Sequence, residues 1–466
     1  MAEEVGVVDG SSAVAAALIE ALGSDCVLLD NDVTSRGAGI WRADNIQARV
    51  LVRPRSTEEV SVAMRICHAH EQTVIAHGGL TGLVESGITS DTDVVISLER
   101  MNQIEAINPL ERTMVVQAGC VLQTIQESAE EHGLMFPLDL GSRGSCTIGG
   151  NISTNAGGNR VIRYGMTRDM ILGLEAVLAD GTVISSMNQM IKNNAGYDLK
   201  QLFIGTEGTL GIVTRAVLRC REEVRSRPTM LVGVQTFEHL MQFLKLADRG
   251  LHGSLSAFEV MWQNYYQLVT TPPAGNTPPL QDHYEFYVLV EAMGADDETV
   301  QTVLEQALAQ GVIADAVLAA SEAQRLQLWG IRDDVEQTFQ HAPVFLFDVS
   351  LRIPFMADYV SQVNQRLNSH FDEVVNFTLG HMGDGNLHFC IGAGSDSAET
   401  RRLVEACVYE PLAAIGGSVS AEHGVGLEKK PYLSIARSSP EVELMRTLKH
   451  ALDPRGLLNP GKIFDL

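Results

Sequence analysis

No part of this sequence limits the possible folds as much as the segment of residues 139–158. It consists largely of Gly, Ser, Thr and Asn, so it is too long and too poor in large apolar side chains to pack as an ordinary core element. Long loops inside compact domains are usually functional. The backbone amides and hydroxyls of this segment are suited to a long cofactor laid along the chain. The alternative is a mobile surface loop.

A second glycine-rich turn, His77–Gly82, directly follows a short apolar strand predicted at residues 74–76. Successive backbone N–H groups in such a turn can form an anion-binding nest suited to a pyrophosphate. The chain has no G-x-G-x-x-G motif, so a Rossmann dinucleotide fold is not supported. Residues 456–462 have P-loop spacing, but Ile463 follows where a magnesium-binding Ser or Thr is required.

Length and charge narrow the class of protein. A chain of 466 residues is expected to form two or three domains. Its formal net charge of −24 argues against a nucleic-acid partner. Seven cysteines without a C-x-x-C pair indicate reduced core residues of a cytosolic protein. Residues 1–5 are acidic and unlike a signal peptide, and no apolar run approaches a membrane span, so we expect a cytoplasmic protein.

The distribution of predicted elements indicates an α+β protein. Helix patterns alternate with short strands, a hairpin turns at Asp180-Gly181, and a polar boundary lies at residues 222–228. Ser56 is expected to cap a helix, with Glu59 completing a capping box. The predicted helices cover residues 13–22, 237–249, 297–309 and 440–452, and predicted strands cover residues 49–52, 230–236 and 284–291.

Two histidines flank a predicted hairpin near the end of the chain. Asp384-Gly385 is a strong two-residue turn signal between strands expected at residues 374–379 and 387–391. In that register His381 faces His388, with Cβ atoms ~4.5–5.5 Å apart. Both rings then reach one metal ion. The alternative is a hairpin with two surface histidines.

Glu422 and His423 stand side by side in a segment of small residues. On an extended chain, neighbouring side chains point to opposite faces, so one can complete a metal site while the other reaches into a cavity. Two histidines and a carboxylate with open positions are the ligand set of a catalytic metal, and they suit Zn²⁺ or another borderline divalent ion.

Together these motifs resemble the flavin-linked D-2-hydroxy acid dehydrogenases of the vanillyl-alcohol-oxidase-type superfamily, of the D-2-hydroxyglutarate and D-lactate dehydrogenase kind. The matching segments occur in the same order as in that family: residues 76–82, 137–158, 199–214, 380–388, 421–426 and 459–462. The resemblance implies a two-lobed FAD-binding domain (PCMH type) and a substrate domain with an antiparallel sheet flanked by helices. It implies an N-terminal segment (1–44), these two domains (45–221 and 222–420), and a C-terminal segment (421–466) that returns to the flavin.

The resemblance also implies how FAD is held. Its pyrophosphate is expected on the amides of residues 77–82, and covalent attachment is not expected because Leu80 stands where covalent relatives have histidine. The cofactor-binding residues expected on this basis are His77, Gly78, Gly79, Leu80, Thr81, Gly82, Pro137, Gly141, Ser142, Ser145, Thr147, Gly149, Gly150, Asn151, Thr154, Gly157, Gly158, Glu207, Ile212 and Asn459.

By the same resemblance, the expected metal ligands are His381, His388 and Glu422, and His423 is the expected catalytic base. Arg332 and Asn386 match substrate-binding positions. The metal orients the substrate hydroxyl and lowers its pKa, and a histidine suits removal of that proton. Hydride transfer to the flavin and a carbanion route both remain open. The electrons pass to an external acceptor, such as an electron-transfer flavoprotein or a quinone, and a homodimer is compatible with the family.

Two positions depart from the D-2-hydroxyglutarate pattern. Glu336 and Leu346 replace a threonine and a lysine that help to hold the distal carboxylate, although Arg352 offers a replacement cation. D-2-hydroxyglutarate is the first substrate expected, with D-lactate and D-malate close. Two other classes of protein are compatible with parts of this pattern. A zinc hydrolase without flavin predicts a colourless protein, and a binding protein without turnover predicts flavin that no hydroxy acid bleaches.

Overall fold

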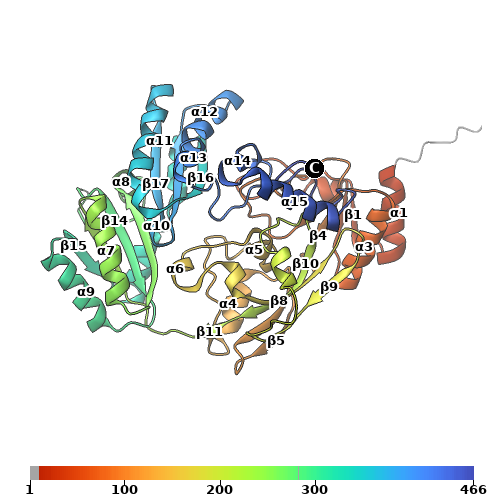
Figure 1. Cartoon of the computed structure of the whole chain (residues 1–466), viewed down its shortest axis with the longest axis horizontal. Coiled ribbons are helices and arrows are strands. Elements are labelled where there is room, and N and C mark those ends of the chain that lie inside the picture. The colour runs from red at the N-terminus through yellow and green to blue at the C-terminus, as the bar shows by residue number, and fades with distance from the viewer. Residues whose placement is uncertain (1–9, 282) are drawn as a thin grey trace, which may run out of the picture.

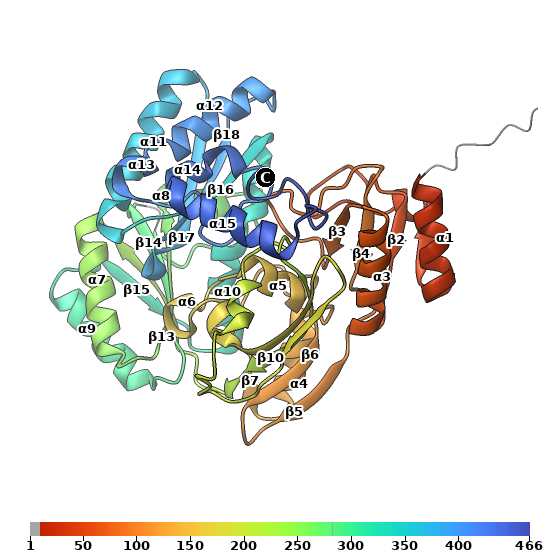
Figure 2. The same cartoon turned by 45° about the vertical axis from the view of Figure 1, so that its right-hand side comes forward.

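The computed structural model describes residues 10–281 and 283–466 (Figure 1). The first half of the chain forms a four-stranded sheet, a five-stranded sheet and a small two-stranded pair, and the second half forms one large sheet with helices on both faces. The last helices, drawn in dark blue, return to lie over the first half in both views (Figures 1 and 2). The C-terminal segment therefore contacts the first sheet, through the bridge between Leu458 and Val74.

The first lobe is a four-stranded sheet in the order β1-β2-β4-β3. The three strands β2, β4 and β3 run parallel, as expected when helices or loops cross between them. Ser56 caps α3 by accepting a bond from the Glu59 backbone N–H, whereas the Glu59 carboxylate bonds the N–H of Arg55 and not of Ser56. The elements of this lobe are α1 (Gly10–Leu22), β1 (Val27–Leu29), α2 (Asn31–Thr34), β2 (Val50–Val52), α3 (Thr57–Ala69), β3 (Val74–His77) and β4 (Val94–Ser97).

The second lobe is a five-stranded antiparallel sheet in the order β5-β6-β10-β8-β9, beside the small pair β11-β7. Both lobes share one apolar core, to which Val14 and Leu18 of α1 also contribute. The elements are β5 (Ile104–Asn108), β6 (Thr113–Gln117), α4 (Leu122–Glu130), β7 (Leu134–Met135), α5 (Ile148–Thr154), α6 (Val161–Tyr164), β8 (Ile171–Val177), β9 (Val183–Ser186), β10 (Ile212–Arg219) and β11 (Arg221–Glu222).

The third unit is a seven-stranded antiparallel sheet in the order β15-β12-β14-β13-β17-β18-β16. Alternate residues of each strand face opposite sides. One side packs against α7, α9, α11 and α12, and the other against α8 and α10. The strands are β12 (Thr229–Val234), β13 (Leu255–Trp262), β14 (Phe286–Ala292), β15 (Asp315–Leu318), β16 (Val344–Ser350), β17 (Val375–His381) and β18 (Asn386–Gly392). The helices are α7 (Phe237–Gly250), α8 (Gln263–Thr270), α9 (Asp297–Ala309), α10 (Glu322–Asp333), α11 (Met356–His370), α12 (Ala398–Tyr409) and α13 (Leu412–Ile415).

The C-terminal segment contains α14 (Leu433–Ala436) and α15 (Ser439–Leu452) and then joins the first sheet. Leu458 forms a parallel bridge with Val74 on β3. The buried Lys449 ammonium donates to the Thr209 and Leu458 carbonyl oxygens and pairs with Asp453. These contacts fix the end of the chain beside the turn that follows β3.

Several sequence expectations are confirmed by these elements. The helix predicted at residues 297–309 has those bounds, and the predicted hairpin around Asp180-Gly181 joins β8 to β9. All seven cysteines are buried and free. Among the described residues, no helix has both the length and the apolar character needed to cross a bilayer.

Candidate active site

The histidine hairpin differs in register from the prediction. Leu379, not His381, pairs with His388, because a short 3₁₀ turn, Met382–Asp384, precedes Gly385. Gly385 has a φ of 91°, which favours glycine. His381 instead pairs with Glu259 on β13. The predicted register, in which His381 pairs with His388, is therefore wrong by two residues. Because side chains alternate with a period of two, a shift of two residues keeps both histidines on one face of the sheet.

The two imidazoles still lie together. Their ring centroids are 5.2 Å apart at an interplanar angle of 85°. His381, His388 and Glu422 offer ligand atoms that all lie within 4.8 Å of one another. A second group with the same property joins Asp348, His388 and His423. His388 belongs to both groups, so the residues fit a divalent ion in the manner expected from sequence.

The buried Glu259 carboxylate holds the His381 imidazole in place. The Glu259 carboxylate accepts a bond from His381 Nδ1 at 2.8 Å and from Arg332 Nε at 2.9 Å. Burial disfavours the charged imidazole, but the Glu259 carboxylate outweighs it and raises the pKa of His381 to about 9. Burial and the neighbouring His381 hold the pKa of His388 well below its ordinary value. A carboxylate behind a ligating imidazole fixes the tautomer and ring orientation.

Asp348 is the centre of a second buried network. Its Oδ2 accepts the backbone N–H groups of Ala421, Glu422 and His423, at 2.9–3.1 Å. The Lys429 ammonium lies 3.5 Å away and is also buried. Burial raises the pKa of the Asp348 carboxyl, but His423 and Lys429 outweigh it and hold that pKa well below its ordinary value. Three consecutive donors on one oxygen fix the backbone that carries Glu422 and His423.

We expect Asp348→Asn to lower the free energy of unfolding by about 3–5 kcal/mol, because it leaves the Lys429 ammonium buried without its counter-charge. Urea unfolding followed by tryptophan fluorescence measures the change. The same substitution at the exposed Asp372 is the matched control and should alter the free energy by less than about 0.5 kcal/mol. Equal stability of the two variants would show that the buried pair contributes little.

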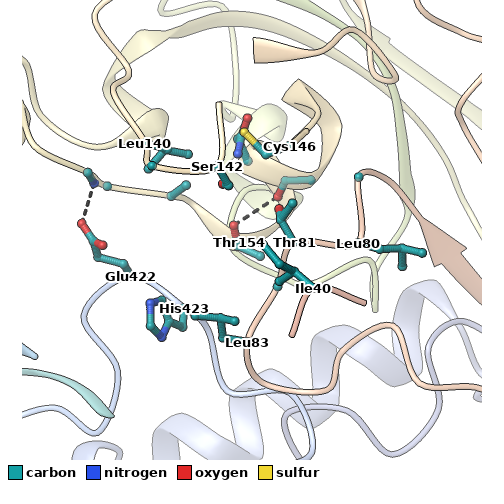
Figure 3. A pocket seen from close by; sticks show the side chains of 18 of the residues that line it. Ile40, Leu80, Thr81, Leu83, Leu140, Ser142, Cys146, Thr154, Glu422 and His423 are labelled. Atoms are coloured by element: carbon teal, nitrogen blue, oxygen red, sulfur yellow. Dashed lines mark hydrogen bonds between the residues drawn. The ribbon is translucent and has the colours of Figure 1, made fainter. Parts of the chain in front are cut away.

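A cavity of about 720 Å³ lies between these histidines and the glycine-rich segments. Figure 3 shows Glu422 and His423 on one side and Leu140, Ser142 and Cys146 on the other, with Leu80 and Thr81 beside them. The Glu422 carboxylate accepts a bond from the Gly158 N–H, so it touches both sides. Burial lowers the pKa of His423, against the opposing influence of Asp348. A neutral imidazole facing a cavity is suited to accept a proton.

The cavity wall opposite the histidines has space for backbone but not for side chains. A Cβ added at Gly78 would lie 2.6 Å from Thr147 Oγ1, and one at Gly79 would collide with the Ser145 carbonyl oxygen. Within the described part of the chain, the buried Thr147 Oγ1 and Asn151 Oδ1 have no hydrogen-bond partner. Unsatisfied buried polar atoms in a cavity indicate a ligand that pairs with them. This wall fits the flavin cofactor expected from sequence.

The structure brings most of the expected site residues to this cavity. Its lining includes the turn at residues 77–82, Arg332, the metal-ligand candidates and His423, together with Gly141, Ser142, Thr147, Gly149, Gly150, Asn151, Thr154, Gly157, Gly158, Glu207, Ile212 and Asn459. The Glu207 carboxylate accepts the backbone N–H groups of Val425 and Gly426. Glu207 therefore connects the first domain to the segment that carries His423.

Four expected residues lie outside the cavity lining. Pro137 and Ser145 are not among the lining residues, although the Ser145 carbonyl oxygen packs against Gly79. Asn386 is buried, and its amide nitrogen donates to Asp348 Oδ1 and the Val349 carbonyl. Arg352 is exposed, with its guanidinium 5.3 Å from the Phe355 ring centroid. The structure gives Asn386 a supporting position under the site and does not place Arg352 as a cation in the cavity.

Sequence reasoning missed Asp348, Glu259 and Lys429. Each lies far along the chain from the group it supports, and Glu259 and Asp348 are single acids in otherwise apolar strands. An acid flanked by large apolar residues was an available signal, because buried carboxylates are nearly always paired. The partner of each acid could not be predicted from sequence, because it comes from another strand or from the C-terminal segment.

Comparisons with known proteins identify the family. Residues 48–186 match the FAD binding domain family, and residues 223–463 match the family described as FAD linked oxidases, C-terminal domain. D-2-hydroxyglutarate dehydrogenase, mitochondrial, of Bos taurus is 40% identical over 89% of this chain and 77% of its own. D-2-hydroxyglutarate dehydrogenase of Xanthomonas citri pv. viticola is 38% identical over 88% of each chain.

A crystal structure of p-cresol methylhydroxylase with substrate bound has a TM-score of 0.78 at 17% identity, covering 99% of this chain and 98% of its own. At that identity the similarity concerns the fold. It confirms the two-lobed arrangement and the mixed α+β class expected from sequence.

Proposed function

This chain belongs to the FAD-linked D-2-hydroxyglutarate dehydrogenase family, and we propose that it oxidises a D-2-hydroxy acid to the 2-oxo acid with one divalent metal ion at His381, His388 and Glu422. The observation that carries the proposal is the single cavity in which these three residues and His423 face the wall of small residues. The names of the relatives make D-2-hydroxyglutarate the first substrate to test, with D-lactate and D-malate next.

His423 is the proposed base. Its Nδ1 lies 3.8 Å from Asp348 Oδ2, which favours a proton on Nδ1 and leaves Nε2 to accept the substrate hydroxyl proton. The backbone N–H of His423 also donates to Asp348 Oδ2, which fixes the backbone that carries the imidazole. Arg332 is the proposed partner of a substrate carboxylate, and its burial beside His381 supports this role.

Two bound groups complete the chemistry. FAD, held by the glycine-rich wall, supplies the two-electron acceptor. A divalent ion, for which Zn²⁺ is our first choice, supplies a Lewis acid that lowers the pKa of the substrate hydroxyl. The reoxidising partner is proposed to be an electron-transfer flavoprotein or a quinone, and a cytoplasmic location remains a prediction from sequence.

A panel of D- and L-2-hydroxy acids, mixed anaerobically with the purified holoprotein, tests the proposal. We expect D-acids to bleach the visible flavin band and L-acids to leave it, and a chelator to slow the bleaching. Failure of every D-2-hydroxy acid to bleach the flavin would overturn the function. A zinc hydrolase predicts protein without flavin, and the FAD binding domain match argues against it.

We expect Gly79→Ala to lose most of its FAD, because the added Cβ meets the Ser145 carbonyl and the Cys146 Cα in the cofactor wall. The ratio of flavin to protein absorbance should fall about tenfold, as a clash of this size costs about 1–3 kcal/mol or more. Gly37→Ala is the matched control, since Gly37 is exposed outside the cavity lining and its added Cβ has no atom within 4 Å among the described residues. Full flavin content in Gly79→Ala would contradict the placement.

A further inference from the structure

The part of the cavity beside the histidine cluster has an apolar floor. On the sheet face that carries His381 and His388, the buried Asp348 and Glu259 pair with the two histidines and are not part of the cavity lining. The lining positions beside them are Leu346, Leu379 and Cys390. Cys390 pairs with Leu346 on β16, and all three side chains line the cavity. None of them offers a charge or a strong hydrogen bond to a ligand.

The opposite wall is acidic. It is formed by the end of α10 and the residues after it, where Asp333, Asp334 and Glu336 line the cavity. Among the described lining residues, Arg332 is the one Lys or Arg. Its guanidinium is already paired with the buried Glu259 at 2.9 Å and with Asp333 at 3.4 Å. This part of the cavity therefore provides one largely compensated cation and two further acids, Asp334 and Glu336.

These charges set a limit on the substrate. The proposed metal ion and Arg332 suffice for the hydroxyl and the first carboxylate, which every 2-hydroxy acid has. A second carboxylate at the far end would leave water, find no free cation and face like charges. An uncharged side chain loses little on leaving water and gains contact with Leu346 and Cys390.

We propose that the substrate is a D-2-hydroxy acid with an uncharged, apolar side chain, and that Glu336 and Leu346 reject a second carboxylate. The inference rests on the proposed function and narrows it to a substrate class. Of the three substrates considered above, it favours the D-lactate type over D-2-hydroxyglutarate and D-malate.

The test compares D-2-hydroxypentanoate with D-2-hydroxyglutarate, which have the same five-carbon chain and differ by the terminal carboxylate. We expect kcat/KM, measured with an artificial electron acceptor, to favour D-2-hydroxypentanoate by about tenfold or more. An equal or higher value for D-2-hydroxyglutarate would overturn the inference and leave the proposed function standing. If neither compound reduces the flavin, and D-lactate and D-malate also fail to reduce it, the proposed function itself is overturned.

Two variants locate the effect in the named residues. Leu346→Lys, which adds a cation to the cavity wall, should shift the kcat/KM ratio toward D-2-hydroxyglutarate by about tenfold or more. Leu346→Met is the matched control and should keep the wild-type ratio. Glu336→Gln removes one like charge at an exposed position and should favour the dicarboxylate by about threefold, even if Leu346→Lys does not fold. An unchanged ratio in Glu336→Gln, or in folded Leu346→Lys, would refute the assignment.

Discussion

His423→Ala should bind FAD and metal normally and reduce the flavin about 10²–10⁴-fold more slowly, since that is the usual contribution of a positioned general base. His423 lines the cavity beside Glu422, and its backbone is fixed by Asp348 through bonds that do not use the imidazole. The truncation therefore removes the proton acceptor without releasing the segment. Stopped-flow absorbance under anaerobic conditions measures the rate, and the flavin spectrum and metal content verify the site.

His450→Ala is the matched control, because His450 is exposed on α15 away from the cavity. It should keep the wild-type rate. A rate close to wild type in His423→Ala would refute the assignment of the base. Loss of flavin or metal from that variant would instead show that the imidazole has a structural role.

Metal removal is the second large effect. After dialysis against a chelator, we expect the protein to stay yellow and its reduction by a D-2-hydroxy acid to slow on the order of a thousandfold, since a Lewis acid contributes several kcal/mol. Divalent ions added back singly should restore the rate and identify the metal. His388→Ala should give the same loss without recovery, because His388 belongs to both candidate ligand groups.

Elemental analysis measures the metal content of the wild-type protein and of the variants. The wild-type protein should contain about one divalent ion per chain, and His388→Ala should contain almost none. His370→Ala, at the exposed end of α11, should keep both metal and activity. Full activity in thoroughly chelated protein would contradict a catalytic ion.

Local sequence patterns predicted the proximity of the histidines more reliably than their pairing. The Asp384-Gly385 signal identified the hairpin, but the 3₁₀ turn before Gly385 moved the register by two residues. The prediction of a shared face survived because side chains alternate with a period of two. A shift of one residue would have placed His381 and His388 on opposite sides of the sheet.

The parts that sequence did not predict depend on contacts between distant segments. Asp348 bonds residues more than seventy positions away, and Glu259 meets His381 only because β13 pairs with β17. Arg352 was expected to face the substrate, yet β16 ends at Ser350 and the following turn leaves Arg352 exposed. Glycine patterns, by contrast, predicted which segments line the cavity, because a wall without room for side chains requires glycine at those positions.

The bridge between Leu458 and Val74 has a consequence for how the protein matures. Asn459 donates to the Glu207 carbonyl and accepts from the Ala76 N–H, so the last residues complete the wall around the cofactor. Asn459 is synthesised 383 residues after Ala76. A nascent chain can therefore assemble most of its first domain early, but this part of the cavity wall forms only after the second domain has been synthesised.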